Sequence, residues 1–373
     1  ESHVKLAEKL IAITPGDCAK RVYFGNSGAE AVEAGLKIAR YYTRRPRMIS
    51  FLGGFHGRTF AGMTMCGSKK AQRARMGNLV PDVHHIPYPY CYHCVYNETY
   101  PRCIRKDYQG VPLLYCLSYL TDVIFERLID PEDVALVLTE PIQGEGGYII
   151  PPPEFLPGLR KICDEHGIVL IFDEIQSGLG RTGKWFACDH AGVAPDIILI
   201  AKAIASGLPM SATVGRARLM DCAVDKKAWT PGAHGSTFGG NPVVCAAGVA
   251  SLDIIEAKLI RNAARVGDFL IKGMTEIRNR HQIVGEVRGL GLMIGFELVL
   301  DRRTKEPFPK TVSRDGKNIK EIFTGESFKR GLILFGAGFQ SIRMSPPLVI
   351  TRDEAVQALR TIEAVVEWIE ARI

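Results

Sequence analysis

The sequence lacks any long apolar run. No stretch approaches the roughly 18 consecutive apolar residues that a membrane-spanning helix needs, and the first residues do not form a secretory signal. Internal repeats and low-complexity segments are also missing. The formal net charge is +7, but the basic residues form no sustained block. We therefore expect a cytoplasmic protein with no membrane or nucleic-acid partner, whose mild positive charge attracts anionic substrates or a phosphate group.

What is present is the composition of an ordinary globular protein. Of the 373 residues, 46% are hydrophobic and 23% are charged. A chain of this length can bury a large core and tends to divide into two domains.

The ten cysteines are mostly scattered. Seven of them stand alone in apolar or helical contexts and are expected to be reduced packing residues: Cys18, Cys66, Cys116, Cys163, Cys188, Cys222 and Cys245. The other three are Cys91, Cys94 and Cys103, with His93 inside the first pair. Such a C-x2-C pair is compatible with zinc, with a local disulfide or with free thiols, and the sequence places no clear fourth ligand nearby.

Two apolar runs, each typical of a strand covered on both faces, end at a charged residue. Residues 168–172 lead to Asp173, and residues 197–201 lead to Lys202. An unpaired ammonium in apolar surroundings is costly and tends to lose its proton. A neutral lysine can form a Schiff base with pyridoxal phosphate, and a carboxylate beside the ring nitrogen keeps that nitrogen protonated. Gln176 could donate a hydrogen bond to the phenolic oxygen of the ring.

Residues 173–183, DEIQSGLGRTG, and residues 195–202, PDIILIAK, resemble the signature of the class III (subgroup II) aminotransferases. These are pyridoxal-phosphate enzymes of fold type I. The resemblance implies an α/β fold, in which a large cofactor-binding domain (1–252) has a mostly parallel seven-stranded sheet. A smaller α+β domain (253–373) would follow it. Lys202 and Asp173 would be the catalytic residues.

Two loops of small residues suit a phosphate group. The turn Ser27-Gly28-Ala29 lies between a strand pattern and a helix pattern, where free backbone N–H groups meet the positive end of the helix dipole. Ser236 and Thr237 lie in a second such loop. The resemblance implies that both loops bind the cofactor phosphate, the second one from the partner subunit. We therefore expect a homodimer, or a dimer of dimers, with shared active sites.

The remaining candidates would hold the ring or the substrate. Residues 54–59, GFHGRT, match a family pattern in which Phe55 stacks on the ring and Arg58 grips a substrate carboxylate. Glu140 and Glu145 follow a buried strand pattern, where open α/β sheets bind ligands. In relatives that act on ω-amino substrates, the equivalent of Glu145 pairs with an arginine, here Arg343, and moves away when a second carboxylate arrives. No metal is expected among these residues.

We therefore expect transamination between an amino donor, such as the ω-amino acids 4-aminobutyrate or ornithine, and 2-oxoglutarate. A racemase or epimerase of the same family is the alternative, because its motifs look alike. A non-catalytic relative and a zinc-dependent function are weaker alternatives. Set beside the family, the chain starts late at Glu1, so the N-terminal segment that usually folds onto the small domain is expected to lie outside this sequence, with any substrate contacts it makes.

Overall fold

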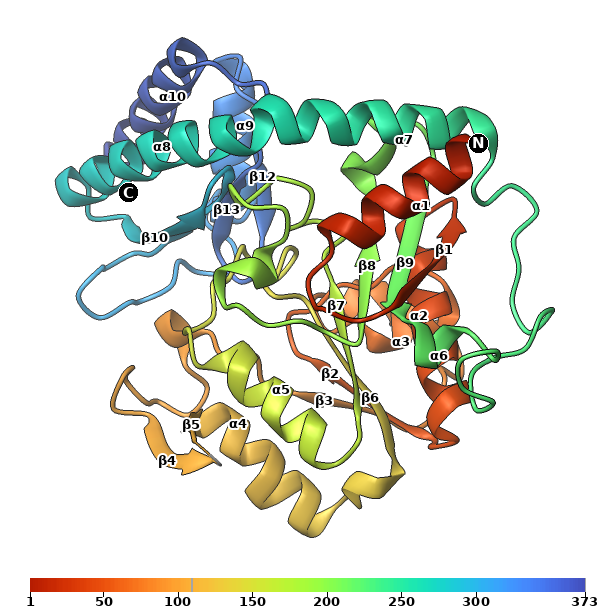
Figure 1. The fold of residues 1–373 in the computed structure, drawn as a ribbon. Coiled ribbons are helices and arrows are strands. Elements are labelled where there is room, and N and C mark those ends of the chain that lie inside the picture. The colour runs from red at the N-terminus through yellow and green to blue at the C-terminus, as the bar shows by residue number, and fades with distance from the viewer. Residues whose placement is uncertain (109, 373) are drawn as a thin grey trace. The chain divides into compact units, whose positions relative to one another are not determined.

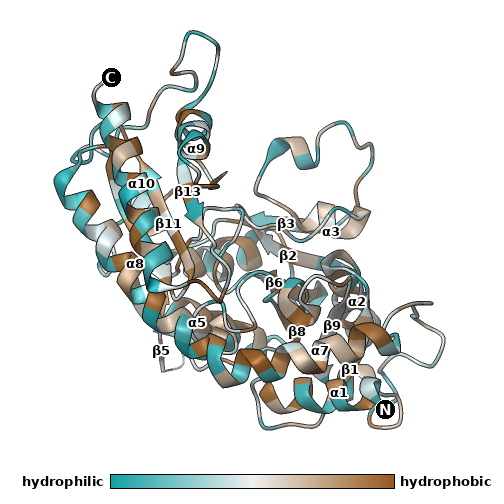
Figure 2. Cartoon of the chain, turned by 90° about the horizontal axis from the view of Figure 1, so that it is seen from above, coloured by the Kyte–Doolittle hydropathy of each residue, from teal (hydrophilic) through white to brown (hydrophobic). Residues whose placement is uncertain are grey.

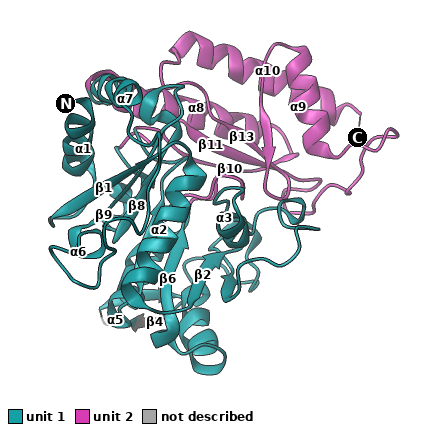
Figure 3. Ribbon diagram, turned by 90° about the vertical axis from the view of Figure 1, so that its right-hand side faces the viewer, with its two compact units in different colours: residues 1–141, 151–179, 185–256 teal, residues 142–150, 180–184, 257–373 magenta. Residues whose placement is uncertain are grey.

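The structure is a computed structural model that describes residues 1–108 and 110–372 (Figure 1). The chain divides into two units, coloured separately in Figure 3. Unit 1 contains residues 1–141, 151–179 and 185–256, and unit 2 contains residues 142–150, 180–184 and 257–373. The predicted domain boundary between residues 252 and 253 stays a prediction.

Unit 1 is built on a seven-stranded sheet in the order β1-β9-β8-β7-β6-β2-β3. Every pair from β8 to β3 is parallel, and β9 is antiparallel to both of its neighbours. This confirms the mostly parallel seven-stranded sheet. The strands are β1 (Lys20–Gly25), β2 (Arg47–Phe51), β3 (Val83–Ile86), β6 (Val134–Thr139), β7 (Val169–Asp173), β8 (Ile197–Ile200) and β9 (Ser211–Arg216).

The register of the parallel strands brings the candidate residues to one edge of the sheet. Thr139 on β6 pairs with Phe172 on β7, and Asp173 pairs with Leu199 on β8. The next charged side chains beyond β6 and β8 belong to Glu140 and Lys202. Carboxyl ends of neighbouring parallel strands meet at the same edge, which is where open α/β sheets bind ligands.

Helix α2 (Gly28–Thr43) shows how the sequence specifies this unit. The Ser27 hydroxyl accepts a hydrogen bond from the Glu30 backbone N–H and caps the helix. The apolar face of Val32, Leu36 and Ala39 is buried against the sheet. The side chains of Val32 and Leu36 each contribute about 1.5–3 kcal/mol.

The other helices of unit 1 are α1 (Ser2–Ile13), α3 (Phe60–Met65), α4 (Tyr115–Tyr119), α5 (Phe155–Glu165), α6 (Ala217–Met220) and α7 (Pro242–Ile254). Among the described residues, no helix is both long and apolar enough to cross a bilayer.

Residues 87–108 and 110–114 leave the sheet as an irregular segment. It contains a short 3₁₀ turn at Cys91–His93 and a hairpin of β4 (Ile104–Tyr108) and β5 (Val111–Leu114). In Figure 1 this hairpin lies beside α4 and α5.

Unit 2 has a four-stranded antiparallel sheet in the order β10-β11-β13-β12, which gives the predicted α+β architecture. Its strands are β10 (Val284–Leu290), β11 (Met293–Leu298), β12 (Phe335–Ala337) and β13 (Ser341–Met344), and its helices are α8 (Ile260–Arg280), α9 (Ile319–Lys329) and α10 (Arg352–Glu370). Figure 2 shows polar and apolar residues alternating along α8 and α10. On α8 the buried residues Val266, Leu270 and Met274 recur every four residues, which is the spacing of one helical face.

Candidate active site

Asp173 is the last residue of β7 and is buried, with 4% of its surface exposed. One carboxylate oxygen accepts a hydrogen bond from the Ile175 backbone N–H at 3.1 Å, and the other lies 2.8 Å from Nδ1 of His56. His56 is also buried, with 1% exposed. The carboxylate is therefore held in one orientation by two groups. Sequence reasoning did not assign His56 a role, although it lies inside the GFHGRT motif.

Lys202 opens a short 3₁₀ turn, η6 (Lys202–Ala205), directly beyond β8. Its φ of +48° places a non-glycine residue in the left-handed region, where strained backbone gathers at functional sites. The strand before it is fully buried, as predicted. The Lys202 side chain itself is exposed. The prediction that it has apolar surroundings is therefore wrong. The reason is that β8 ends at the edge of the sheet and Lys202 lies beyond that end.

Gln176 carries a polar atom that needs a partner. Its side-chain Oε1 is buried and has no hydrogen-bond partner among the described residues. Leaving a buried polar atom unsatisfied costs about 1–3 kcal/mol, so a bound group with a polar edge would remove this cost. Gln176 lies on the turn that follows Asp173. The atom without a partner is an acceptor, whereas the contact expected with the phenolic oxygen of the ring uses the side-chain N–H as donor.

Gly28 packs tightly against the same turn. A Cβ atom at Gly28 would lie 3.1 Å from the Ile175 side chain. The N-terminus of α2 is thus in close contact with the segment that carries Asp173, and a larger residue at position 28 would push the two apart.

The loop of residues 53–59 joins the site from β2. The Phe55 backbone N–H donates to a carboxylate oxygen of Glu140 at 3.1 Å, which ties the loop to the end of β6. Gly57 has a φ of +107°, and a Cβ there would lie 3.1 Å from the Cβ of Ala29. The Arg58 guanidinium is exposed and lies 5.8 Å from the centre of the Phe55 ring. Phe55, Arg58, Glu140 and Ala29 therefore share one edge of unit 1.

The two loops that were predicted to bind the phosphate group are in contact in unit 1. The Asn26 side-chain amide donates to Ser236 Oγ at 3.0 Å, so the loop of residues 234–240 touches the start of α2 in the same chain. Ser236 Oγ also accepts the Gly239 N–H at 3.1 Å, which closes the loop. Thr237 is exposed, and so is Phe238 beside it, at 72%.

Glu145 and Arg343 both belong to unit 2 and form an ion pair there. One carboxylate oxygen of Glu145 lies 2.5 Å from a guanidinium nitrogen of Arg343, and the two side chains are 17% and 16% exposed. Arg343 is on β13, opposite Gly295 and Phe335. The structure thus makes the predicted pairing of these two residues. Both belong to unit 2, and the other candidates belong to unit 1.

Arg288, on β10, holds the turn that carries Glu145. Its guanidinium donates to the carbonyl oxygens of Gly147 and Tyr148, at 2.6 and 3.2 Å, and to Ser341 Oγ at 2.7 Å. It also pairs with the fully buried Glu297 at 3.2 Å. Sequence reasoning missed Arg288, because nothing in the local pattern shows that this strand residue faces residues 147 and 148.

Glu174 is a buried acid next to Asp173. Burial raises the pKa of its carboxyl group to about 7, although hydrogen bonds from Ser177 and from the Cys188 backbone lower it. The Cys188 N–H donates to Glu174 Oε1 at 2.8 Å. These bonds fix the turn after β7, and they do so beside the catalytic candidate Asp173.

The Glu174→Gln variant is expected to change how stability depends on pH. Because the folded-state pKa is raised, the folded chain holds a proton that the unfolded chain releases between about pH 4.5 and pH 7. This group therefore lowers the free energy of unfolding by about 3 kcal/mol as the pH rises through that window. Glutamine stays neutral, so the variant should gain stability relative to the parent from pH 5 to pH 8, as measured by urea denaturation. The exposed Glu165→Gln serves as control, and identical pH profiles for Glu174→Gln and the parent would contradict the assignment.

The family model for class III aminotransferases matches residues 1–366. The chain belongs to this family. It is therefore a pyridoxal-phosphate-dependent class III aminotransferase, and the fold described above is that of fold type I. The 4-aminobutyrate aminotransferase GabT of Escherichia coli is 37% identical over 365 residues, which are 97% of this chain and 78% of the relative.

Other relatives of this class III aminotransferase are named for a different reaction. The alanine/serine racemase of Pyrococcus horikoshii is 37% identical over 374 residues, which are 98% of this chain and 73% of the relative. Among solved structures, an amine transaminase from an uncultivated Pseudomonas species, in its pyridoxal-phosphate-bound form, superposes with a TM-score of 0.86 at 33% identity. That match covers 99% of this chain and 81% of the other. Overall identity therefore does not separate the transaminase from the racemase.

Proposed function

We propose that this class III aminotransferase transfers the amino group of an ω-amino acid, such as 4-aminobutyrate or ornithine, to 2-oxoglutarate. The observation that carries the proposal is the ion pair between Glu145 and Arg343, 2.5 Å apart and largely buried. A transaminase of this kind must accept, at one position, a substrate with an additional carboxylate and a substrate without it.

A paired arginine meets both demands. The planar fork of Arg343 suits a carboxylate bound through two hydrogen bonds. When the substrate lacks that carboxylate, Glu145 takes its place, and the arginine is not left as an unpaired buried charge, which would be strongly destabilising. A carboxylate from 2-oxoglutarate would displace Glu145. The charge beside Arg343 would then change little, because one carboxylate replaces another.

We assign the chemistry to the edge of unit 1. Bound pyridoxal phosphate supplies an aldehyde that holds the substrate nitrogen and a ring that accepts electrons when the substrate carbon loses its proton. Lys202 removes that proton and returns one, as general base and then general acid. Asp173 provides the negative charge that keeps the ring nitrogen protonated, and His56 holds Asp173 in place.

The remaining unit 1 candidates would bind the cofactor or the substrate. Gln176 and Phe55 would contact the ring, while Arg58 and Glu140 would lie on the substrate side. Ser27, Gly28 and Ala29 would hold the phosphate group bound to their own chain, and Ser236 and Thr237 would hold the phosphate group bound to the partner chain.

We further propose a cytoplasmic homodimer, or dimer of dimers, in which Thr237 of one chain reaches the cofactor phosphate of the other. The exposed Thr237 and Phe238 support this, because a loop that crosses to a partner must be uncovered in the single chain.

A racemase is the second candidate, favoured by the alanine/serine racemase of Pyrococcus horikoshii among the relatives. A racemase takes the same proton from the substrate carbon and returns one to the opposite face, and the amino group stays on the substrate. The residues assigned to proton transfer would serve both reactions.

One experiment separates the two. A panel of amino donors, including 4-aminobutyrate, ornithine and L-alanine, is incubated with 2-oxoglutarate, and glutamate is measured. The same L-amino acids are then incubated without an oxo acid, and the D-isomer is measured. We expect glutamate from an ω-amino donor and no D-isomer. A D-isomer formed without glutamate production would replace the proposal with the racemase.

Variants of the ion pair test the role of Arg343. Arg343→Met should raise the KM for 2-oxoglutarate about 10–100-fold, because a charge-assisted pair contributes about 1.5–3 kcal/mol. Glu145→Gln should instead lower kcat/KM for the ω-amino donor by about tenfold, because Arg343 then lacks its partner when that donor is bound. Steady-state kinetics with each substrate varied in turn measure both effects.

Arg330→Met is the matched control, because Arg330 also pairs with a glutamate, Glu326, four residues earlier on α9. It should leave both KM values unchanged. If Arg343→Met raised the KM for the two substrates equally, the selective role of the arginine would be wrong.

A further inference from the structure

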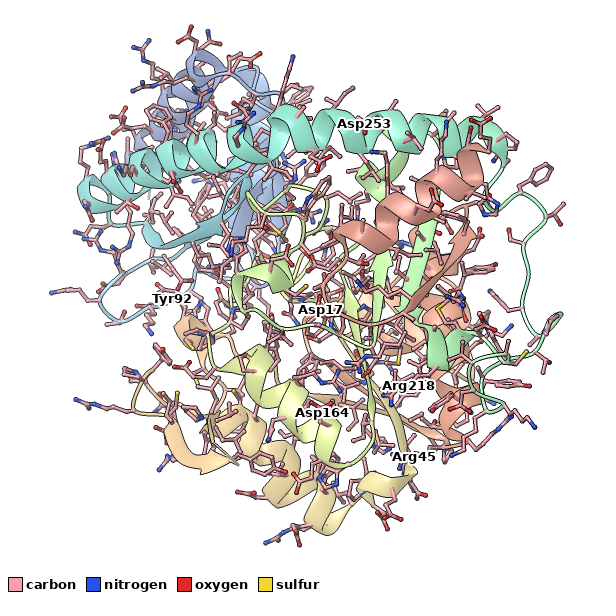
Figure 4. The ribbon with its side chains drawn as sticks, in the orientation of Figure 1. Asp17, Arg45, Tyr92, Asp164, Arg218 and Asp253 are labelled. Atoms are coloured by element: carbon pink, nitrogen blue, oxygen red, sulfur yellow. The ribbon has the colours of Figure 1, made fainter. Side chains whose placement is uncertain are left out.

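Four cysteines gather in the irregular segment of unit 1. Cys91, Cys94 and Cys103 were singled out in the sequence without a fourth ligand, and the structure supplies one in Cys116. The structure shows no disulfide among the cysteines that it describes. The spacing of the four is C-x2-C-x8-C-x12-C. Figure 4 labels Tyr92, which lies between the first two.

A hairpin brings the second pair together. Ile104 on β4 pairs with Leu114 on β5, and the Tyr115 N–H donates to the Cys103 carbonyl at 2.9 Å. Cys103 and Cys116 therefore lie at the open end of one hairpin, where β4 begins and β5 ends, although 12 residues separate them in the sequence. The distance along the chain hid this proximity, and Cys116 was read as a single packing residue.

The first pair lies on a tight turn. Residues Cys91–His93 form a 3₁₀ turn, and the Asn97 N–H then donates to the Cys94 carbonyl at 3.1 Å. A C-x2-C pair on such a turn, facing two cysteines from a hairpin, is the arrangement by which small structural zinc sites obtain four sulfur ligands.

The four cysteines line one small cavity. Its volume is about 20 Å³, and tyrosine rings, among them Tyr88, Tyr96 and Tyr115, make up much of the rest of its wall. This space suits a single water-sized guest. The thiols of Cys91, Cys103 and Cys94 all lie close enough to Cys116 to interact with it electrostatically.

We propose that Cys91, Cys94, Cys103 and Cys116 form a structural zinc site with four sulfur ligands. Four thiolates without an open position are the ligand set of a structural site rather than a catalytic one. The size of the cavity favours one ion over a cluster. The site is separate from the residues assigned to catalysis, and it departs from the expectation that the chain binds no metal.

Without zinc, the sulfur atoms of the four cysteines do not lie close enough together to bind one ion. Among the described residues, the triad whose potential ligand atoms all lie within 4.8 Å of one another is His281, Glu363 and Glu367, and not three of these cysteines. Each cysteine has a single side-chain torsion with three staggered positions, so its sulfur can turn inward while the backbone stays in place. Binding would then release the thiol protons.

A zinc ion would supply what this segment lacks. Between β3 and α4 the chain is mostly loop with short strands, and several of its side chains are exposed, including Val95 and Tyr100 at 67% and 37%. Segments with little core of their own are commonly stabilised by a metal or by disulfides. We expect the ion to fix residues 91–116 and to leave the chemistry of Lys202 and Asp173 unaffected.

The test is metal and thiol analysis of the purified chain loaded with pyridoxal phosphate. We expect one zinc per chain by mass spectrometry of the metal content, and ten reactive thiols after denaturation in the presence of a chelator. Under native conditions, chelation should release the zinc, expose four further thiols and make residues 91–116 sensitive to protease. Cobalt in place of zinc should show the visible bands of a tetrahedral thiolate site.

Cys116→Ser and Cys91→Ser should each lose the bound zinc, while the control Cys18→Ser, an exposed cysteine elsewhere in unit 1, should keep it. The native chelation assay on the parent decides the case if the first two variants do not fold. No zinc together with fewer than ten thiols would show disulfides instead and overturn the proposal. Full zinc occupancy in Cys116→Ser, or iron in place of zinc, would overturn it as well.

Discussion

The Lys202→Ala variant is expected to lose about 10⁴-fold or more of its turnover. The reason is that alanine has no amine to hold the cofactor aldehyde or to move the proton at the substrate carbon. The fold should be retained, because the Lys202 side chain is exposed and buries little surface. Steady-state rates measure turnover, urea denaturation measures the stability of the fold, and visible absorbance measures bound pyridoxal phosphate.

Lys272→Ala on α8 is the matched control, because it removes another exposed lysine. It should retain full turnover. Substantial transamination by Lys202→Ala, without added amine, would mean that another lysine carries the reaction.

The same variant tests the shared active site. In a mixed dimer of Lys202→Ala and Thr237→Ala chains, a crossing loop would create one intact site, so activity should exceed that of either variant alone. If Thr237 serves its own chain, mixing restores nothing.

Asp173→Asn is expected to lower kcat by about 10²–10³-fold, comparable to losing one group that stabilises developing charge. Asparagine has nearly the same shape and can still accept the Ile175 N–H and contact His56. It lacks the negative charge that keeps the ring nitrogen protonated. The measurement is kcat together with cofactor absorbance, and we expect the cofactor to remain bound while turnover falls.

The exposed Asp268→Asn on α8 is the control for the loss of one carboxylate. It should not change kcat. An Asp173→Asn variant that keeps kcat within about threefold of the parent would remove Asp173 from the mechanism and leave it as a residue that fixes the turn after β7.

Much of unit 1 could be predicted from local pattern. The apolar runs before Asp173 and Lys202 are buried strands, and the small residues at 27–29 begin a helix as expected. The pattern works because a strand buried on both faces admits almost no polar residue, so its end is visible in the sequence.

Contacts between distant segments were not visible in this way. His56 meets Asp173 across 117 residues, Arg288 reaches Gly147 across 141, and a hairpin brings Cys116 beside Cys103. Each contact depends on strand order and register, which no local spacing encodes. The exposure of Lys202 was misjudged for a related reason: burial of a strand says nothing about the residue just past the edge of the sheet.

The sequence by itself predicted the chemistry of this protein: which side chains would hold an aldehyde, a ring nitrogen and a phosphate, and which buried runs end at them. Only the tertiary structure decided which groups hold those side chains in place, that Glu145 and Arg343 neutralise each other, and that four cysteines face one cavity. Residue types and their periodicity are local properties of a chain, whereas pairing across a sheet or hairpin is settled by how the whole chain packs.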